Sequence, residues 1–124
     1  MKIVFDNILN KTVFVSGANR GLGKAIVYEM LNCGVSKVYA GMRNPIDMVD
    51  PRIVPIQLDI TNDESVKNAV KMCGDVNILV NNAGVCSKGY VNDSNGMELA
   101  NEMLETNLYG TMRMCREFSD TLKK

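Results

Sequence analysis

The sequence contains no histidine among its 124 residues. Histidine is the usual general base near neutral pH and the commonest metal ligand, so its absence excludes Ser-His-Asp and Cys-His catalysis. Four cysteines are present, but no two form a Cys-x-x-Cys pair, and a sulfur-only zinc site would need all four to converge. We therefore expect no metal site, and free, mostly buried thiols in a reducing, cytoplasmic compartment.

The chain also lacks net charge and long apolar segments. Fourteen basic residues balance fourteen acidic ones, whereas nucleic acid and anionic lipid attract clustered Lys and Arg. No apolar run approaches the roughly 18 residues that a membrane span requires, and Asp6, Asn7 and Asn10 interrupt the N-terminus before a signal-length run forms. These features favour a soluble protein that binds neither nucleic acid nor membrane. A hydrophobic content of 46% is enough for one core, and we expect residues 1–124 to form a single domain.

Short β-branched runs alternate with segments whose apolar residues recur at helical spacing. The patterns predict strands at 12–16, 37–42, 53–58 and 76–80, and helices at 22–33, 62–74 and 97–124. This alternation predicts an α/β fold, a Rossmann-like, doubly wound parallel sheet of about four strands in the order 3-2-1-4 with helices on both faces. Pro55 favours an edge position for the third strand. Gly34 is expected to end the first helix, and Gly110 to bend the last helix or allow close packing.

The loop that follows the first predicted strand, 16–23, has the sequence SGANRGLG. Its glycines let the backbone approach a pyrophosphate, and the following helix directs free N–H groups at the anion. The alternative is a tight turn with glycines for geometry alone. A P-loop would need glycine at position 18 and Ser or Thr at position 25, but this sequence has alanine at both, Ala18 and Ala25. The loop therefore predicts a phosphate site outside the P-loop class.

The G-x-x-x-G-x-G spacing of Gly17, Gly21 and Gly23 resembles that of the short-chain dehydrogenase/reductase family. Three further segments match motifs of that family in order. They are the adenine-contacting turn LDIT at 58–61, VNNAG at 80–84 and TNLYG at 106–110. The four matches cover essentially the whole chain, which therefore resembles the N-terminal, cofactor-binding half of such an enzyme.

The resemblance implies which residues bind a dinucleotide. The glycine loop would line the diphosphate, Asp59 and Ile60 would meet the adenine, and the 82–84 segment would approach the nicotinamide-side ribose. The expected cofactor-binding residues are Gly17, Asn19, Arg20, Gly21, Leu22, Gly23, Arg43, Asp59, Ile60, Asn82, Ala83 and Gly84. Two of them have structural alternatives: Asp59 as a turn acid that caps backbone N–H groups, and Asn82 as a brace between neighbouring strands.

The cofactor preference follows from charge at the end of the second predicted strand. An NAD site of this fold presents an acidic residue about 20 residues past the glycine loop. The sequence there is Gly41-Met42-Arg43, without a carboxylate, and the guanidinium of Arg43 suits a 2′-phosphate. Arg20 could add a second positive charge. The sequence therefore favours NADP over NAD, which remains possible, and the alternative for Arg43 is a solvated residue at a strand end.

The family's reaction, hydride exchange between nicotinamide and a carbonyl or alcohol, uses a tyrosine with a lysine four residues later, a serine and an asparagine. Asn107 matches that catalytic asparagine. Tyr28, Tyr39, Tyr90 and Tyr109 are followed four residues later by Asn32, Arg43, Ser94 and Arg113. Arginine does not give up its proton at usable pH. We therefore expect a chain truncated before the catalytic serine and Tyr-x-x-x-Lys, and inactive alone.

Three interpretations remain open: part of an NADP-dependent oxidoreductase, a catalytically inactive NADP-binding fragment, or a protein-interaction module. A small carbonyl or alcohol substrate is expected only for the complete chain. The fourth predicted strand would leave Ile78, Leu79 and Val80 at an uncovered edge, and such edges recruit partners. We expect self-association through this edge or through the methionine-rich last helix.

Overall fold

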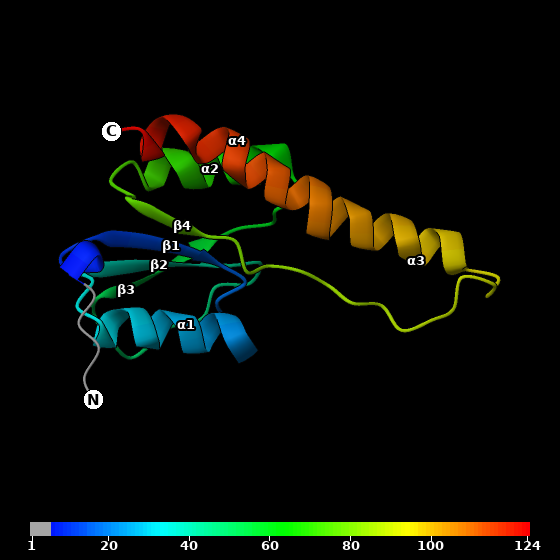
Figure 1. Ribbon diagram of the computed structural model, residues 1–124, viewed down its shortest axis with the longest axis horizontal. Coiled ribbons are helices and arrows are strands. Elements are labelled where there is room, and N and C mark those ends of the chain that lie inside the picture. Colours follow the sequence, from blue (N-terminus) through cyan, green and yellow to red (C-terminus); the bar gives the residue numbers. More distant parts are fainter. Residues whose placement is uncertain (1–5) are drawn as a thin grey trace.

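A computed structural model describes residues 6–124 and contains one parallel sheet of four strands (Figure 1). The strands are β1 (Thr12–Ser16), β2 (Lys37–Met42), β3 (Ile53–Gln57) and β4 (Ile78–Val80), in the order β3-β2-β1-β4. This confirms the predicted partial doubly wound sheet and its order 3-2-1-4. The edge position of β3 also confirms the interpretation of Pro55, which pairs with Ala40 of β2.

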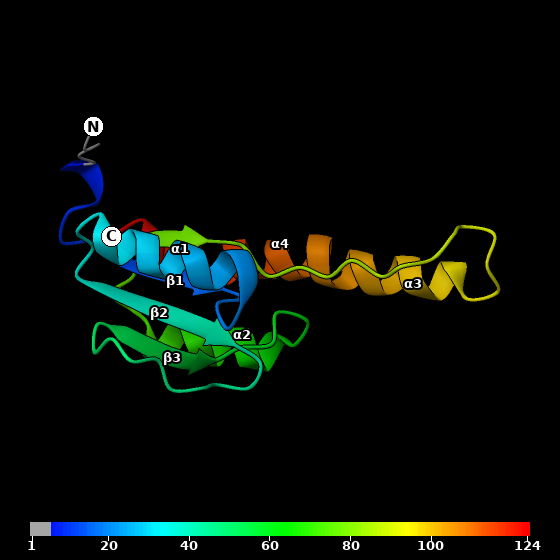
Figure 2. The same cartoon turned by 90° about the horizontal axis from the view of Figure 1, so that it is seen from below.

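Helices cover both faces of the sheet, as predicted. Helix α1 (Gly21–Asn32) lies on one face, and α2 (Asp63–Met72) and α4 (Thr111–Leu122) lie on the other (Figure 1). A short 3-10 helix, η1 (Asp6–Ile8), precedes β1. Helix α3 (Gly96–Met103) and a π-helical segment, η2 (Leu104–Gly110), run directly into α4. Both views show α3 projecting beyond the sheet (Figures 1 and 2).

The two faces of the sheet carry separate hydrophobic clusters because successive strand residues point to opposite sides. Val13 and Val15 of β1 pack in the cluster beneath α1. Phe14, between them, packs in the cluster beneath α2 and α4, with its ring centroid 5.1 Å from that of Phe118. All five residues of β1 are buried, as expected for a strand with a neighbour on each side.

Local signals set several element boundaries. Gly34 follows α1 with φ +98°, a left-handed conformation typical of the residue that ends a helix, as predicted. The side chain of Asn62 accepts a hydrogen bond from the Ser65 N–H at 2.9 Å and caps α2. Strand β4 is shorter than predicted and begins at Ile78; just before it, the side chain of Asn77 accepts a hydrogen bond from the Thr12 N–H at 2.9 Å.

The last predicted helix is continuous, but its middle is π-helical. The sequence did not indicate this change of pitch. Gly110, at the end of the π-helical segment, is buried against Ile60, and a Cβ added there would lie 2.6 Å from the Ile60 Cδ1 atom. Of the two roles considered for Gly110, close packing is therefore the one observed.

The expectation of mostly buried thiols is wrong. Cys73 is buried and Cys33 half-buried, whereas Cys86 and Cys115 are exposed. Cys86 lies in the long segment between β4 and α3, and Cys115 follows Met114 on α4, about 100° around the helix from that buried neighbour. Within residues 6–124, no helix is both long and apolar enough to cross a bilayer.

Candidate functional site

A pocket of about 350 Å³ lies at the edge of the sheet where the strands end. Its walls come from the segments at the carboxyl ends of all four strands, within residues 17–23, 41–43, 58–61 and 82–85, and Thr106 of η2 completes the lining. In open parallel sheets, ligands bind at this edge. The topology therefore gathers four distant parts of the sequence around one cavity.

Every residue expected from the sequence to bind a cofactor lines this pocket. The members of this set are Gly17, Asn19, Arg20, Gly21, Leu22, Gly23, Arg43, Asp59, Ile60, Asn82, Ala83 and Gly84. Six further residues line it and were not proposed as site residues: Gly41, Met42, Leu58, Thr61, Val85 and Thr106. Five of them adjoin a predicted site residue, and Gly41 lies two positions before Arg43, so closeness in the sequence was the signal that could have found them.

The loop between β1 and α1 is packed tightly enough to require glycine at particular positions. Gly17 has φ +67°, and a Cβ there would lie 2.9 Å from the Ala83 Cα atom. A Cβ on Gly23 would overlap the Gly17 carbonyl oxygen. The first turn of α1 therefore lies directly against the loop, and backbone atoms form this wall of the pocket.

Asn82 and Ser16 join the ends of β1 and β4. The Ser16 hydroxyl oxygen accepts hydrogen bonds from the N–H groups of Asn82 at 3.1 Å and Ala83 at 3.0 Å. The Asn82 side-chain amide donates to the carbonyl oxygens of Ser16 at 3.2 Å and Gly17 at 3.1 Å. Asn82 thus braces the strands, the structural alternative considered for it, while also lining the pocket.

The N-terminus of α1 faces this pocket without a side-chain cap. Arg20, its N-cap residue, makes no capping hydrogen bond, and the first turn of α1 contains no acidic residue. Helix α2, by contrast, is capped by Asn62 and carries Asp63 and Glu64 in its first turn. Unpaired N–H groups and the helix dipole make such an N-terminus favourable for an anion. Arg43 adds positive charge to the same pocket.

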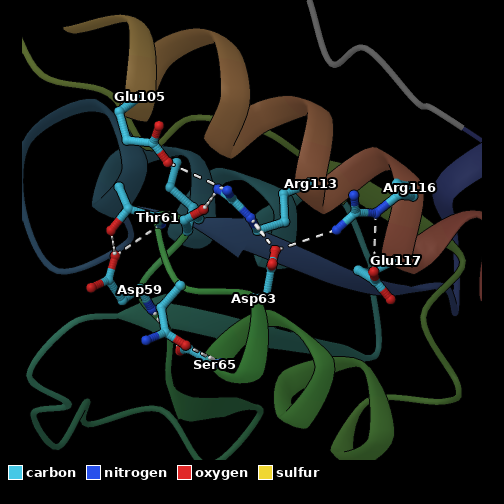
Figure 3. Close-up of polar contacts among 10 residues, drawn as sticks. Asp59, Thr61, Asp63, Ser65, Glu105, Arg113, Arg116 and Glu117 are labelled. Carbon is cyan, nitrogen blue, oxygen red and sulfur yellow. Dashed lines mark hydrogen bonds and ion pairs between the residues drawn. The ribbon is translucent and has the colours of Figure 1, made fainter. Parts of the chain in front are cut away.

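Asp59 stabilises its own turn. One carboxylate oxygen accepts hydrogen bonds from the Thr61 hydroxyl at 2.6 Å and the Thr61 N–H at 2.9 Å (Figure 3). The bond from the Thr61 hydroxyl is the main reason why the pKa of Asp59 lies below its usual value, and the positive charges of Arg43 and Arg113 lower it further. Asp59 therefore makes the turn-capping contacts that were considered as its structural alternative, and it also lines the pocket.

The sequence model of the family described as short chain dehydrogenase matches residues 11–124. The chain belongs to the short-chain dehydrogenase family. It is 35% identical to the short chain dehydrogenase tazN of Aspergillus terreus (strain NIH 2624 / FGSC A1156) over 95% of this chain. Among solved structures it resembles a short chain dehydrogenase from Burkholderia cenocepacia J2315, crystallised with NADP, at 40% identity and a TM-score of 0.88 over 94% of this chain.

A second solved relative is the aldohexose dehydrogenase of Thermoplasma acidophilum in ligand-free form, 29% identical with a TM-score of 0.81 over 95% of this chain. The chain spans 29% of the length of tazN, 50% of the Burkholderia chain and 46% of the Thermoplasma chain. The match to these three short-chain dehydrogenases therefore covers nearly all of this chain but half or less of each relative.

Asn107, expected from the sequence to be the catalytic asparagine, contacts the pocket wall beyond β4. Its side-chain oxygen accepts from the Val85 N–H at 2.8 Å, and its side-chain nitrogen donates to the Val85 carbonyl oxygen at 2.7 Å. It lies in the π-helical segment, and such segments occur frequently at functional sites. Asn107 itself does not line the pocket, whereas its neighbours Thr106 and Val85 do.

One tyrosine does contact a lysine, but at the opposite edge of the sheet. The ammonium of Lys37 donates to the Tyr39 hydroxyl oxygen at 2.8 Å, and the Tyr39 hydroxyl donates to Asp75 at 2.8 Å. Lys37 and Tyr39 lie in the first half of β2 and Asp75 precedes β4, and none of the three lines the pocket. Burial raises the pKa of Tyr39, which opposes its use as a base. The contact is not the Tyr-x-x-x-Lys pair of short-chain dehydrogenases.

Proposed function

We propose that this chain is the cofactor-binding part of an NAD(P)-dependent short-chain dehydrogenase/reductase. The observation that carries the proposal is the uncapped N-terminus of α1, which faces a glycine-walled pocket at the carboxyl edge of the sheet. The glycine loop and the α1 N–H groups would hold the diphosphate. Asp59 and Ile60 would meet the adenine, and the segment 82–84 would lie beside the nicotinamide ribose.

NADP is the cofactor that the charges of this pocket favour. Arg43 lies in the wall at the end of β2, where segment 41–43 carries no carboxylate to repel a 2′-phosphate. Arg20 in the glycine loop adds a second positive charge. The Burkholderia relative, 40% identical, was crystallised with NADP, which supports the same choice. NAD remains the alternative cofactor.

A fluorescence titration of the chain with NADPH tests cofactor binding. We expect saturable binding with a lower Kd for NADPH than for NADH, because only NADPH carries the 2′-phosphate. The absence of binding at millimolar NADPH would contradict the proposal. It would instead favour the third interpretation, a protein-interaction module.

In a short-chain dehydrogenase that contains this chain, a bound nicotinamide would supply or accept the hydride exchanged with a carbonyl or alcohol substrate. Asn107 is proposed to serve proton transfer in that reaction, as the resemblance implies. Its two hydrogen bonds to Val85 would fix its position beside the nicotinamide end of the pocket. The four free cysteines are compatible with the proposed cytoplasmic location.

Residues 1–124 contain no Tyr-x-x-x-Lys motif, and we expect no hydride transfer from them alone. The measurement is NADPH oxidation with a panel of small carbonyl substrates. Turnover that disappears in Tyr39→Phe or Tyr109→Phe would show that this chain holds its own acid/base group. Binding without turnover fits both the cofactor-binding part of an enzyme and an inactive NADP-binding fragment, and the longer protein's activity separates these two.

A further inference from the structure

Arg113 of α4 contacts three segments of the chain through one guanidinium group (Figure 3). Its Nη1 donates to the Ile60 carbonyl oxygen at 2.6 Å, its Nε to Asp63 at 2.5 Å, and its Nη2 to Glu105 at 3.4 Å. The side chain is only 16% exposed. A planar guanidinium presents its donors in a fixed fork, so these contacts define the position of the Ile60 peptide group relative to α4.

Ile60, in the pocket wall, makes two contacts with the continuous helical segment formed by η2 and α4. Its carbonyl oxygen accepts a hydrogen bond from Arg113. Its side chain packs against Gly110, which lies about one helical turn before Arg113. The peptide group and the side chain of one wall residue are therefore both fixed by the same helical segment. Asp59, beside it, is turned back onto Thr61, so the 59–61 turn is held by its own hydrogen bonds and by α4.

The charges around Arg113 favour this arrangement. Asp63 and Glu105 neutralise a guanidinium that is largely removed from water, and charge-assisted hydrogen bonds of this type are stronger than neutral ones. Arg116, three residues later, also reaches Asp63 at 3.3 Å but is 63% exposed. Its other carboxylate contact is Glu117. The two arginines thus share one carboxylate, but the contact to Ile60 belongs to Arg113.

We propose that Arg113 is a positioning residue for the dinucleotide: it holds the 59–61 turn where that turn forms the adenine side of the pocket. The inference rests on the proposed function, because it concerns the cofactor assigned to that pocket. Arg113 does not line the pocket itself, and it acts through the Ile60 carbonyl. Loss of the guanidinium removes the contact that fixes the turn to α4, and the cofactor must then order the turn further on binding, which weakens affinity.

The test compares three variants of the full chain by calorimetric titration with NADPH and with adenosine 2′,5′-bisphosphate, which carries only the adenine end. Arg113→Gln removes the fork. Arg113→Lys keeps the charge but not the planar geometry. Arg116→Gln is the matched control, since it removes the same charge on the same helix without touching Ile60.

We expect Arg113→Gln to raise both Kd values about tenfold, Arg113→Lys to raise them about threefold, and Arg116→Gln to change them less than twofold. Equal Kd values for Arg113→Gln and Arg116→Gln, or a lower thermal midpoint with unchanged Kd, would overturn the inference. If Arg113→Gln does not fold, Arg113→Lys decides, and a Kd equal to that of the wild type overturns it. A wild-type chain that binds neither ligand contradicts the proposed function itself, and this inference with it.

Discussion

Gly21 and Gly23 stand two positions apart in the loop before α1, but a methyl group would meet different surroundings at each. At Gly23 it would overlap the Gly17 carbonyl oxygen and lie 2.5 Å from the Asn82 side-chain nitrogen. At Gly21, with φ +57°, nothing lies within 4 Å of it. We expect Gly23→Ala to reduce NADPH affinity at least 100-fold, because the loop and α1 must separate.

Gly21→Ala is the comparison variant. Its cost in stability is the left-handed conformation, about 1–2 kcal/mol, and because Gly21 also lines the pocket we expect a loss of NADPH affinity that is smaller than for Gly23→Ala. Urea unfolding and NADPH titration of both variants separate the two effects. Equal losses of affinity would show that close packing of α1 on the loop is not what forms the site.

Arg43 is the residue on which the NADP preference most depends. We expect Arg43→Gln to raise the Kd for NADPH about tenfold and that for NADH less than twofold, because only the former carries the 2′-phosphate that the guanidinium would contact. Arg52→Gln, an arginine paired with Asp50 before β3 and outside the pocket lining, is the control. An equal change in both Kd values would mean that Arg43 does not contact the 2′-phosphate and is a solvated residue at the end of β2.

At the scale of elements, local signals were sufficient for most boundaries. Gly34 ended α1, Pro55 marked an edge strand, and the glycine loop joined β1 to α1 as expected. The π-helical pitch of η2 was not predictable, because its residues contact distant parts of the chain: Asn107 bonds Val85, and Gly110 packs on Ile60. Spacing along one helix carries no information about such partners.

Gly110 tests the contact between the helical segment and the pocket wall. Alanine favours helices over glycine by about 1 kcal/mol, yet we expect Gly110→Ala to destabilise the chain by about 1–3 kcal/mol, since the new methyl would displace Ile60. Gly74→Ala, where nothing lies within 4 Å, is the control and should be close to neutral. Chemical denaturation measures both. A stabilised Gly110→Ala would mean that the helix can move away from Ile60 at no cost.

At the scale of the whole molecule, one helical segment holds two walls of the pocket. Asn107 fixes Val85 on the side of β4, and Gly110 and Arg113 fix Ile60 on the side of β3. The remaining walls come from the strand ends themselves. The shape of the pocket therefore depends on how this segment lies across the sheet, and any contact that moves the segment would move both walls.

The expected self-association concerns residues 1–124 produced as an isolated polypeptide. Within residues 6–124, β4 pairs with β1 alone, and η2 and α4 expose Leu104, Leu108 and Met112. An unpaired strand edge and an exposed apolar helical surface both favour association. We expect sedimentation velocity to show oligomers at micromolar concentration. Leu108→Lys with Met112→Lys should reduce them if the helical surface is responsible, whereas the control Val49→Lys, in an exposed loop, should not. Oligomers unchanged by the paired lysines would assign the contact to the β4 edge, and a monodisperse, thermally stable monomer would contradict both routes.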